Sequence, residues 1–325
     1  MSEFRSHIFF ICEDNNNLSS AKSYYPAIYN DIYRIFCKFA AKKRQEVERP
    51  LHIDVREAVE AKAPRYAKRI PGFVYRWLER IVRQKELNKV LKENSGRTGV
   101  DFAEGVLNSF NIKLEVEGLD NLTDGQRYIF ASNHPLGGLD GMALITILGR
   151  KYNGNVKCIV NDILMLIKPL NNVFLPINKH GSQSRRDMEA VDQAYSSDCQ
   201  LITFPAGLCS RRGKDGQIRD TEWKKSFITK SVESRRDIVP VYFEGTNSGR
   251  FYKLANLRKR IGIRLNIEMV MLPGEMVDKS GSTFRIKIGT PIPYATFDGS
   301  RSQKEWAQEV KRRVYDMSTE NKSKK

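Results

Sequence analysis

The sequence predicts an α/β fold in which a mostly parallel sheet is flanked by helices and preceded by a basic, helical N-terminal region. From about residue 110, short apolar segments alternate with helix-like ones, which is typical of a parallel sheet covered by helices. The residues before it are helix-like, rich in lysine and arginine, and poor in glycine. The chain has 325 residues, of which 40% are apolar, enough for a sizeable core. We therefore predict two regions, residues 1–105 and 106–325.

The N-terminal region is expected to contain three helical segments. Residues 29–48 show helical apolar spacing, and a second helix is expected to begin at Asp54 and stop before Pro64. The third segment, residues 70–94, carries an apolar stripe flanked by arginines and lysines. The stripe follows the spacing i, i+3, i+4, i+7, i+8 and consists of Val74, Trp77, Leu78, Ile81 and Val82. Such a helix can lie in an anionic bilayer interface, or its stripe can pack on the α/β region while the arginines stay solvated.

The second region contains the expected strands and several of the helices between them. The expected strands are residues 112–118, 128–132, 156–160, 173–177, 200–204, 238–243, 265–272 and 284–289. The expected helices include residues 184–197, 223–235 and 302–318, and the last of these places Trp306, Val310 and Val314 on one face. Some of the later strands can pair antiparallel.

Charge and cysteine usage limit the classes of partner. The net charge of +17 implies an anionic partner: nucleic acid, an anionic membrane surface or a phosphate-bearing substrate. No helix-turn-helix spacing, aromatic RNA-binding motif or zinc site is visible, so nucleic acid is not expected. The five cysteines are scattered and form no C-x-x-C pair, which disfavours a disulfide framework or a metal site and fits a reducing cytoplasm.

The apolar runs limit how the chain can meet a membrane. The longest are far shorter than a membrane span, so no transmembrane helix is expected. The run at residues 8–12 has only Arg5 before it and no small-residue cleavage site after it, so we expect no signal peptide. Contact with a membrane would therefore be made from its surface.

The segment SNHPLGGLDG, residues 132–141, connects an expected strand to an apolar helix. Open α/β sheets bind ligands at such strand-to-helix loops. Here Asp140 can accept a hydrogen bond from the imidazole of His134, fix its tautomer and raise the basicity of its other nitrogen. The histidine can then take a proton from a hydroxyl. The alternative is a Gly-Gly turn with a capping Asp140 and an exposed His134.

A second glycine-containing turn follows the strand expected at residues 200–204. The stretch ITFPAGLCSRRG, residues 202–213, presents Ser210, Arg211 and Arg212 beyond that turn. Backbone N–H groups and guanidinium groups in such a turn can bind an anion. The alternative is an ordinary basic loop. A third stretch, VPVYFEGTNS at residues 239–248, by itself indicates only a core strand.

The order of these blocks is more specific than any one of them. NH…D is followed by VFLPINK, then FPxG, then VPV, and finally IGTPI at residues 288–292. Over roughly residues 110–320 this set resembles the glycerolipid acyltransferase superfamily, which includes the 1-acylglycerol-3-phosphate acyltransferases. The long NHPLGGLDG and FPAG…SR forms are most similar to the bacterial branch that O-acylates lyso-aminolipids such as glycine or ornithine lipids.

The resemblance implies a reaction and a set of roles. A lipid hydroxyl attacks an acyl thioester and the thiol of acyl carrier protein or coenzyme A leaves, with no acyl-enzyme, no metal and no cofactor beyond this co-substrate. His134 is then the general base and Asp140 its orienting partner, while Cys209 is a small buried or loop thiol. The residues implied to hold the loop or to bind the acceptor and its anion are Asn133, Lys179, Phe204, Pro205, Gly207, Ser210, Arg211 and Arg212.

One departure from the family pattern lies in the catalytic loop. Five residues separate His134 from Asp140, whereas four are usual in the family. Gly137 and Gly138 can absorb the extra residue in a wider loop.

Further departures concern the acceptor. The family's FPEGTRS becomes FPAGLCS, so that Ala206 and Cys209 replace a glutamate and an arginine. Ile177 stands where a phosphate-binding arginine is usual, with Lys179 two residues further on. The loss of both arginines disfavours a glycerol-phosphate acceptor and favours a lyso-aminolipid, while Arg211, Arg212 and Lys179 can bind an anion from shifted positions.

A few other polar residues have weaker claims. Asp220, Glu222 and Trp223 either line the acceptor pocket or begin a helix with Asp220 as its N-cap. The remaining histidines, His7, His52 and His180, are expected at the surface.

Three functions follow from the sequence. The leading prediction is O-acylation of a lysolipid in membrane lipid biosynthesis by a peripheral enzyme at the cytoplasmic face of the inner membrane. Synthesis of phosphatidic acid from 1-acylglycerol-3-phosphate is the alternative within the family. The alternative of another class is a non-catalytic membrane-binding protein built on a decayed acyltransferase fold.

Overall fold

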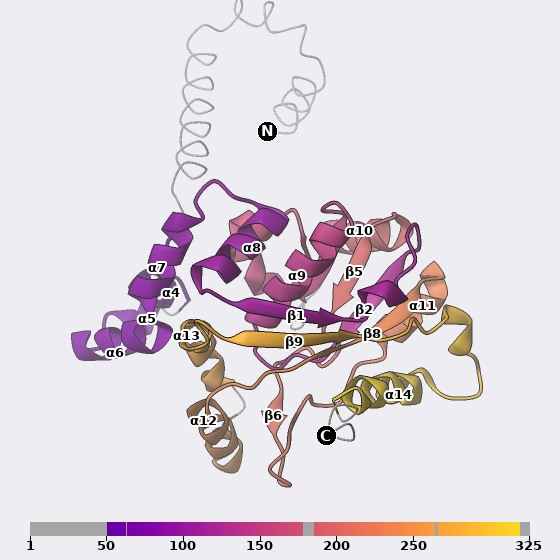
Figure 1. Ribbon diagram of the computed structural model, residues 1–325. Helices are drawn as coiled ribbons and strands as arrows, with labels where there is room; N and C mark the ends of the chain where they lie inside the picture. The colour runs from indigo at the N-terminus through magenta and orange to yellow at the C-terminus, as the bar shows by residue number, and fades with distance from the viewer. Residues whose placement is uncertain (1–50, 63, 178–184, 264–265, 319–325) are drawn as a thin grey trace, which may run out of the picture. The chain divides into compact units, whose positions relative to one another are not determined.

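A computed structural model describes residues 51–62, 64–177, 185–263 and 266–318, which belong to one compact unit (Figure 1). The helix expected at residues 29–48 lies outside the described residues. The first described helices are α4 (Val55–Lys62), α5 (Pro64–Ala67), α6 (Gly72–Val82), α7 (Gln84–Glu93) and α8 (Gly99–Ser109). Asp54 caps α4, because its carboxylate accepts hydrogen bonds from the backbone N–H groups of Arg56 and Glu57.

The segment at residues 70–94 forms two helices instead of one. Arg83 adopts the left-handed conformation with φ of 58°, which ends α6 and begins α7. All of the apolar stripe lies on α6, before the break, and its members differ in exposure: Val82 is buried, whereas Trp77 is 55% exposed. The stripe is therefore divided between the protein interior and the surface.

The remaining elements build a seven-stranded sheet in the order β1-β9-β8-β2-β5-β3-β4. Its strands are β1 (Lys113–Glu117), β2 (Tyr128–Ser132), β3 (Val156–Asn161), β4 (Phe174–Ile177), β5 (Gln200–Thr203), β8 (Asp237–Phe243) and β9 (Thr283–Ile288). All neighbours pair parallel except β8 and β9. The mostly parallel sheet is confirmed, as is an antiparallel pairing among the later strands.

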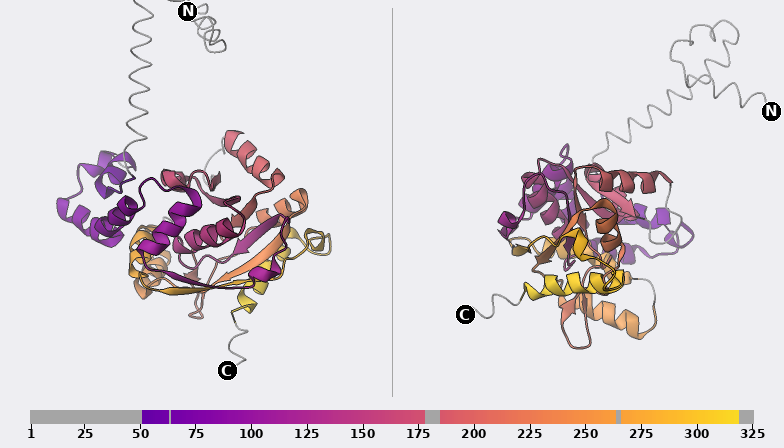
Figure 2. Two further views of the ribbon diagram at one scale, coloured as in Figure 1. Left: turned by 45° about the horizontal axis from the view of Figure 1, so that its top comes forward. Right: turned by 90° about the vertical axis from the view of Figure 1, so that its right-hand side faces the viewer.

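Helices cover both faces of this sheet. Alternate residues of β2 point to opposite sides: Phe130 joins a core with α8 and α9 (Leu139–Lys151), and Ile129 joins a core with α10, α11 and α14. Figure 2 shows α8 and α9 side by side. The bounds of the other three helices are α10 (Arg185–Ser196), α11 (Ser226–Ser234) and α14 (Gln303–Asp316). As predicted, α14 buries Trp306, Val310 and Val314.

Two findings correct or extend the sequence-based elements. No strand forms in the described part of residues 265–272, where the chain instead forms the 3-10 helix η4 (Ile267–Met271) followed by α13 (Leu272–Asp278). Pro273 lies in the first turn of α13, where its fixed φ suits a helix. In addition, α8 runs across position 105, the predicted boundary between regions, and packs in the main core.

The connecting segments complete the chain. The helix α12 (Gly249–Arg260) precedes η4, and the short strands β6 (Arg211–Arg212) and β7 (Ile218–Arg219) form a separate antiparallel pair. The other short helices are η1 (Leu119–Asn121), η2 (Asp162–Leu166), η3 (Lys168–Leu170) and η5 (Tyr294–Thr296). Within the described ranges, no helix is both long and apolar enough to cross a membrane.

Candidate active site

His134 and Asp140 meet in the loop between β2 and α9. The imidazole Nδ1 of His134 lies 2.9 Å from Oδ2 of Asp140. Asp140 is in the first turn of α9 and completely buried, whereas the His134 side chain is 18% exposed. The contact expected from the sequence therefore exists in spite of the extra residue, and the interpretation of His134 as an exposed residue on a turn is wrong.

The two glycines explain how the wider loop closes. Gly137 adopts φ of 80°, a conformation that glycine reaches without strain, and Gly138 follows as the residue before α9. The bend turns the N–H groups of Leu136 and Gly137 towards Asp140 Oδ2, at 3.0 and 3.2 Å. The carboxylate thus organises the loop as well as the imidazole.

These donors also set the ionisation of Asp140. Burial raises its pKa, but the charge and hydrogen bond of His134 and the two backbone N–H groups lower it, and the balance lies below the ordinary value. A charged Asp140 accepts a hydrogen bond from Nδ1–H of His134, which places the basic lone pair on Nε2, across the ring. The geometry is that of an oriented general base.

Asn133 and Phe204 hold the histidine from two sides. The side-chain amide of Asn133 donates to the carbonyl of Phe243 at 2.9 Å and accepts from its N–H at 2.7 Å, which ties the loop to the end of β8. The ring of Phe204, just after β5, stacks on the imidazole with the ring centroids 4.1 Å apart. Neighbouring strand ends therefore converge on His134.

Asp220 had only a weak claim to a functional role from the sequence, but in the structure it is hydrogen-bonded to the catalytic loop. Its Oδ1 accepts hydrogen bonds from the backbone N–H of His134 at 3.2 Å and from Ser210 Oγ at 2.6 Å. Its Oδ2 accepts from Trp223 Nε1 at 2.9 Å. Because α11 begins only at Ser226, Asp220 is not a helix cap, and that interpretation is wrong.

Burial raises the pKa of Asp220 even though these donors oppose it. Helix α14 also holds Asp220, because the Asp220 N–H donates a hydrogen bond to Tyr315 Oη at 2.7 Å. The backbone N–H of Ser210 in turn donates to the His134 carbonyl at 2.7 Å. Asp220 and Ser210 therefore bind the backbone of His134 and position the residue through it.

The adjacent arginines of the FPAG…SRR stretch have different environments. Arg211 is buried, and its guanidinium donates to Glu268 at 2.9 Å and to the Cys209 carbonyl at 2.6 Å. Glu268, on η4, also pairs with Arg258 of α12 at 2.8 Å. The sequence did not identify Glu268 and Arg258, since they belong to a stretch that was expected to be a strand and to a basic helix.

Arg212 is only half-buried and lies over the ring of Tyr252, with 5.4 Å between the guanidinium carbon and the ring centroid. Its Nε is buried and has no hydrogen-bond partner among the described residues. Arg212 therefore differs from Arg211, whose guanidinium donates to Glu268 and to the Cys209 carbonyl.

The rest of the FPAG turn is structural in character. Gly207 has φ of 66° and donates its N–H to the Phe204 carbonyl at 2.9 Å, and the Pro205 carbonyl accepts from Lys224 N–H at 3.1 Å. Cys209 is fully buried, as expected, and burial raises its pKa to about 11. Lys179 lies outside the described residues. The described part of the chain contains no cluster of histidine, cysteine and carboxylate side chains that could hold a metal.

A histidine oriented by a buried carboxylate at the end of a parallel strand is an arrangement that can activate a hydroxyl. The family model described as Acyltransferase matches residues 57–322, and the chain belongs to this acyltransferase family. It is accordingly an enzyme that transfers acyl groups.

Two curated relatives are similar over most of their length. A lyso-glycine lipid O-acyltransferase of Phocaeicola vulgatus is 49% identical over 263 residues, which cover 81% of this chain and 94% of that protein. A protein of the same name from Bacteroides thetaiotaomicron is 48% identical over 81% of this chain and 96% of its own length. Among solved structures, the 1-acyl-sn-glycerophosphate acyltransferase PlsC of Thermotoga maritima is 19% identical, with a TM-score of 0.41 over 76% of this chain and 89% of that chain.

Proposed function

We propose that this acyltransferase moves a fatty acyl group from a thioester of acyl carrier protein or coenzyme A to the hydroxyl of a lyso-aminolipid, with a lyso-glycine lipid as the leading acceptor. The 2.9 Å contact between His134 and Asp140 is the observation that carries the chemistry. The two relatives named lyso-glycine lipid O-acyltransferase support the acceptor.

In the proposed reaction, His134 Nε2 takes the proton of the acceptor hydroxyl while its oxygen attacks the thioester carbonyl carbon. The new C–O bond forms, a tetrahedral intermediate carries the charge, and the C–S bond then breaks. The imidazolium returns its proton to the departing thiolate, which leaves as a thiol. Asp140 stabilises the imidazolium between these steps and keeps the ring in its productive tautomer. The balance of atoms requires no metal, cofactor or acyl-enzyme.

We propose that the headgroup of the lipid acceptor binds near Arg212, two residues after Ser210 in the chain. The carboxylate of a glycine headgroup is an anion that a guanidinium binds with two parallel hydrogen bonds. We propose that Arg212 does this, with Lys179 as a second candidate. Arg211 is assigned a supporting role, since Glu268 and Cys209 already engage its guanidinium. Phe204, Pro205 and Gly207 shape the turn around His134, and Asn133 fixes the loop.

The enzyme is proposed to work as a peripheral protein on an anionic membrane, at the cytoplasmic face of the inner membrane. An acceptor and product that are both lipids reside in the bilayer, so the enzyme must approach it. The net charge of +17 supports attraction to anionic lipids. The absence of a membrane-spanning helix among the described residues is compatible with this arrangement.

A headgroup panel tests the proposal. Purified full-length protein is mixed with acyl thioester and one detergent-dispersed acceptor: lyso-glycine lipid, lyso-ornithine lipid or 1-acylglycerol-3-phosphate. Thiol release gives the rate, and mass spectrometry identifies the product. We expect the fastest turnover with lyso-glycine lipid, and Arg212→Gln is expected to raise KM for that acceptor more than it lowers kcat.

Faster turnover of 1-acylglycerol-3-phosphate would contradict the proposed acceptor. Detectable lipid binding without thiol release from any acceptor would favour a non-catalytic protein. Running the panel with acyl carrier protein and coenzyme A thioesters in parallel identifies the preferred donor.

A further inference from the structure

Large apolar side chains are exposed on three elements that are neighbours in the fold. Most of the large exposed apolar residues in the described ranges lie on α6, on η4, or on α12 and the residues after it. The 3-10 helix η4 packs against both α6 and α12 and so lies between them. We call this the α6–η4–α12 surface, and its apolar members are Phe73, Trp77, Leu257, Ile261, Ile263 and Val270.

The helical spacing aligns these side chains on the outer faces. Phe73 and Trp77 are four residues apart on α6. Leu257 of α12 and Ile261, the C-cap of α12, are also four residues apart, so each pair lies on one side of its helix, about one turn apart. The opposite face of α12 is buried in the protein. Each of these two helices thus exposes a pair of large apolar side chains. Such a patch is unusual on a protein surface that contacts only water.

The charged residues among these side chains are nearly all basic. On α12 the exposed ionisable residues are Arg250, Lys253, Lys259 and Arg260, and the helix contains no acidic residue. On α6, Arg76 and Arg80 flank Trp77 and are exposed, and the one acidic residue of the helix, Glu79, is half-buried. The single acidic residue of η4 is Glu268, which is fully buried and already paired. Exposed tryptophan, phenylalanine and leucine with surrounding lysine and arginine match the chemistry of an anionic lipid interface.

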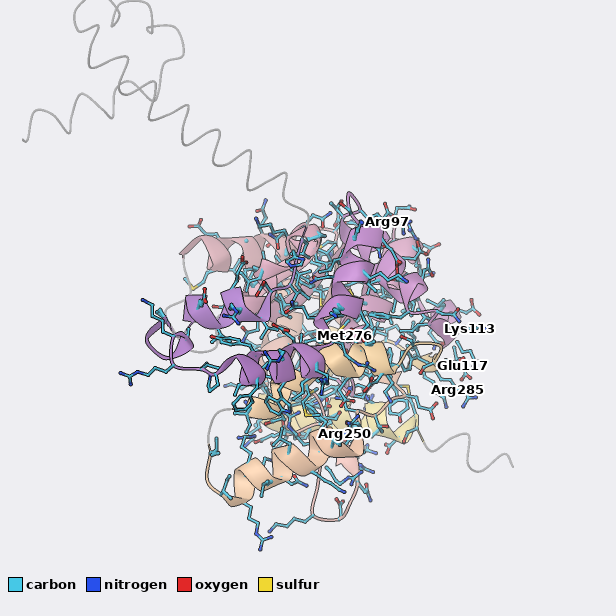
Figure 3. The ribbon with its side chains drawn as sticks, turned by 90° about the vertical axis from the view of Figure 1, so that its left-hand side faces the viewer. Arg97, Lys113, Glu117, Arg250, Met276 and Arg285 are labelled. Atoms are coloured by element: carbon cyan, nitrogen blue, oxygen red, sulfur yellow. The ribbon has the colours of Figure 1, made fainter. Side chains whose placement is uncertain are left out.

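The surface is joined to the candidate active site through η4 and α13. Leu272 and Met276 lie against Gly137 and Gly138 of the catalytic loop, and Met269 lies beside Cys209. Figure 3 looks at this side of the molecule and shows α13, with Met276, beside α12, with Arg250, while Lys113 lies at the far edge of the view. A bilayer in contact with the surface would be close to the loop that carries His134.

We propose that the α6–η4–α12 surface docks on an anionic lipid bilayer and thereby presents the catalytic loop to lipid acceptors. This inference rests on the proposed function for its purpose, because a lipid acceptor must be collected from a membrane. The docking itself is a property of the surface and can be measured without turnover.

Intrinsic fluorescence provides a direct test. Trp77 is the exposed member of the chain's three tryptophans, because Trp223 and Trp306 are only 1% and 8% exposed. Full-length protein is titrated with vesicles of phosphatidylcholine, or of an equal mixture of phosphatidylcholine and phosphatidylglycerol. We expect the mixed vesicles alone to shift the emission to shorter wavelength, and brominated acyl chains to quench it. Trp77→Phe should remove both signals while the protein still sediments with the vesicles.

Paired variants test the apolar and the basic parts separately. Leu257→Ser with Ile261→Ser, and Lys253→Glu with Arg260→Glu, are each expected to weaken vesicle binding by about tenfold or more. The matched controls are Met188→Ser with Val232→Ser, which are exposed apolar residues of α10 and α11, and Lys113→Glu on β1. Circular dichroism before and after heating confirms that each variant is folded.

Three results would overturn the proposal: no emission shift with mixed vesicles, an equal shift with pure phosphatidylcholine, or unchanged binding by both paired variants. A concentration-dependent dimer that the same variants dissociate would assign the surface to a second copy of the chain instead. Thiol release from detergent-dispersed acceptor is measured on every variant, so that a failure of docking is distinguished from a failure of the proposed function.

Discussion

The catalytic loop and the α6–η4–α12 surface differ in how their side chains are held. In the loop, Asp140 is fully buried and accepts hydrogen bonds from several donors, and Asp220 fixes the backbone of His134. On the surface, Trp77 and Phe73 project into solvent and are more than half exposed. The comparison teaches that proton transfer requires a preorganised polar network, whereas binding to a fluid bilayer requires only apolar area and charge of the right sign.

The largest loss of activity is expected from a substitution of His134 in the catalytic loop. His134→Ala removes the proposed base and should lower the rate of thiol release by about 10²–10⁴-fold. Vesicle binding should not change, because the substitution leaves the surface intact. His52→Ala, at an exposed position, is the matched control and should have wild-type activity. Comparable rates for His134→Ala and His52→Ala would refute the assignment of the base.

Substitution of Arg211 tests whether its ion pair with Glu268 of η4 stabilises the fold. Arg211→Ala leaves Glu268 buried with Arg258 as its one charged partner among the described residues, and should lower the free energy of unfolding by about 3 kcal/mol. Arg212→Ala, one residue away and half-buried, is the control and should cost far less stability. Urea denaturation of both variants measures the difference. Equal stabilities would show that the two arginines have the same role.

Asp220→Asn tests whether Asp220 positions His134, and its effect on protein stability is expected to depend on pH. Asp220→Asn should lower kcat by about tenfold or more, because an amide has one acceptor oxygen, whereas the carboxyl group of Asp220 accepts hydrogen bonds at both Oδ1 and Oδ2.

The stability of this variant separates positioning from simple loss of fold. The folded-state pKa of Asp220 is raised above its ordinary value of 3.8, so its contribution to stability is present below that value and is lost as the pH rises through the folded-state pKa. The stability advantage of the wild type over Asp220→Asn should therefore shrink from acidic to neutral pH in urea titrations, while the loss of kcat persists. An advantage that grows with pH would contradict a raised pKa.

Cys209 should give the smallest effect, even though it lies beside the network. Cys209→Ala should change the rate of thiol release by less than about twofold, because the reaction needs no thiol nucleophile. Alkylation of the Cys209 thiol by iodoacetamide should be slow at neutral pH, since burial raises its pKa to about 11. Loss of activity in proportion to alkylation of this residue would show that Cys209 participates in the chemistry.

The sequence predicted the parts of the fold that rest on local pattern and on the order of the blocks. The sheet, its strands and the closing helix were accessible because apolar spacing reports which face of an element is buried. The loop of His134 was accessible because a strand, a glycine pair and a helix surround it. The spacing alone could not determine whether His134 and Asp140 touch, since this depends on the positive φ of Gly137.

The features that the sequence did not predict correctly are determined by tertiary contacts. Residues 267–271 are apolar enough for a strand, but the buried pairing of Glu268 with Arg211 and Arg258 accompanies a 3-10 helix there. The division of α6 from α7 at Arg83 has no signal such as glycine or proline at that position. The role of Asp220 depends on a hydrogen bond to a residue 86 positions away, which no local pattern encodes.

The central claim is that chemistry and membrane docking reside in two separable regions, and one crossed activity measurement tests it most directly. Thiol release is compared for wild type, His134→Ala and Leu257→Ser with Ile261→Ser, with the lyso-glycine lipid presented either in detergent or in anionic vesicles. We predict that His134→Ala is inactive in both forms, and that the surface variant matches wild type in detergent and loses activity only on vesicles. Equal activity of the surface variant and wild type on vesicles, or equal losses in both forms, would contradict the claim.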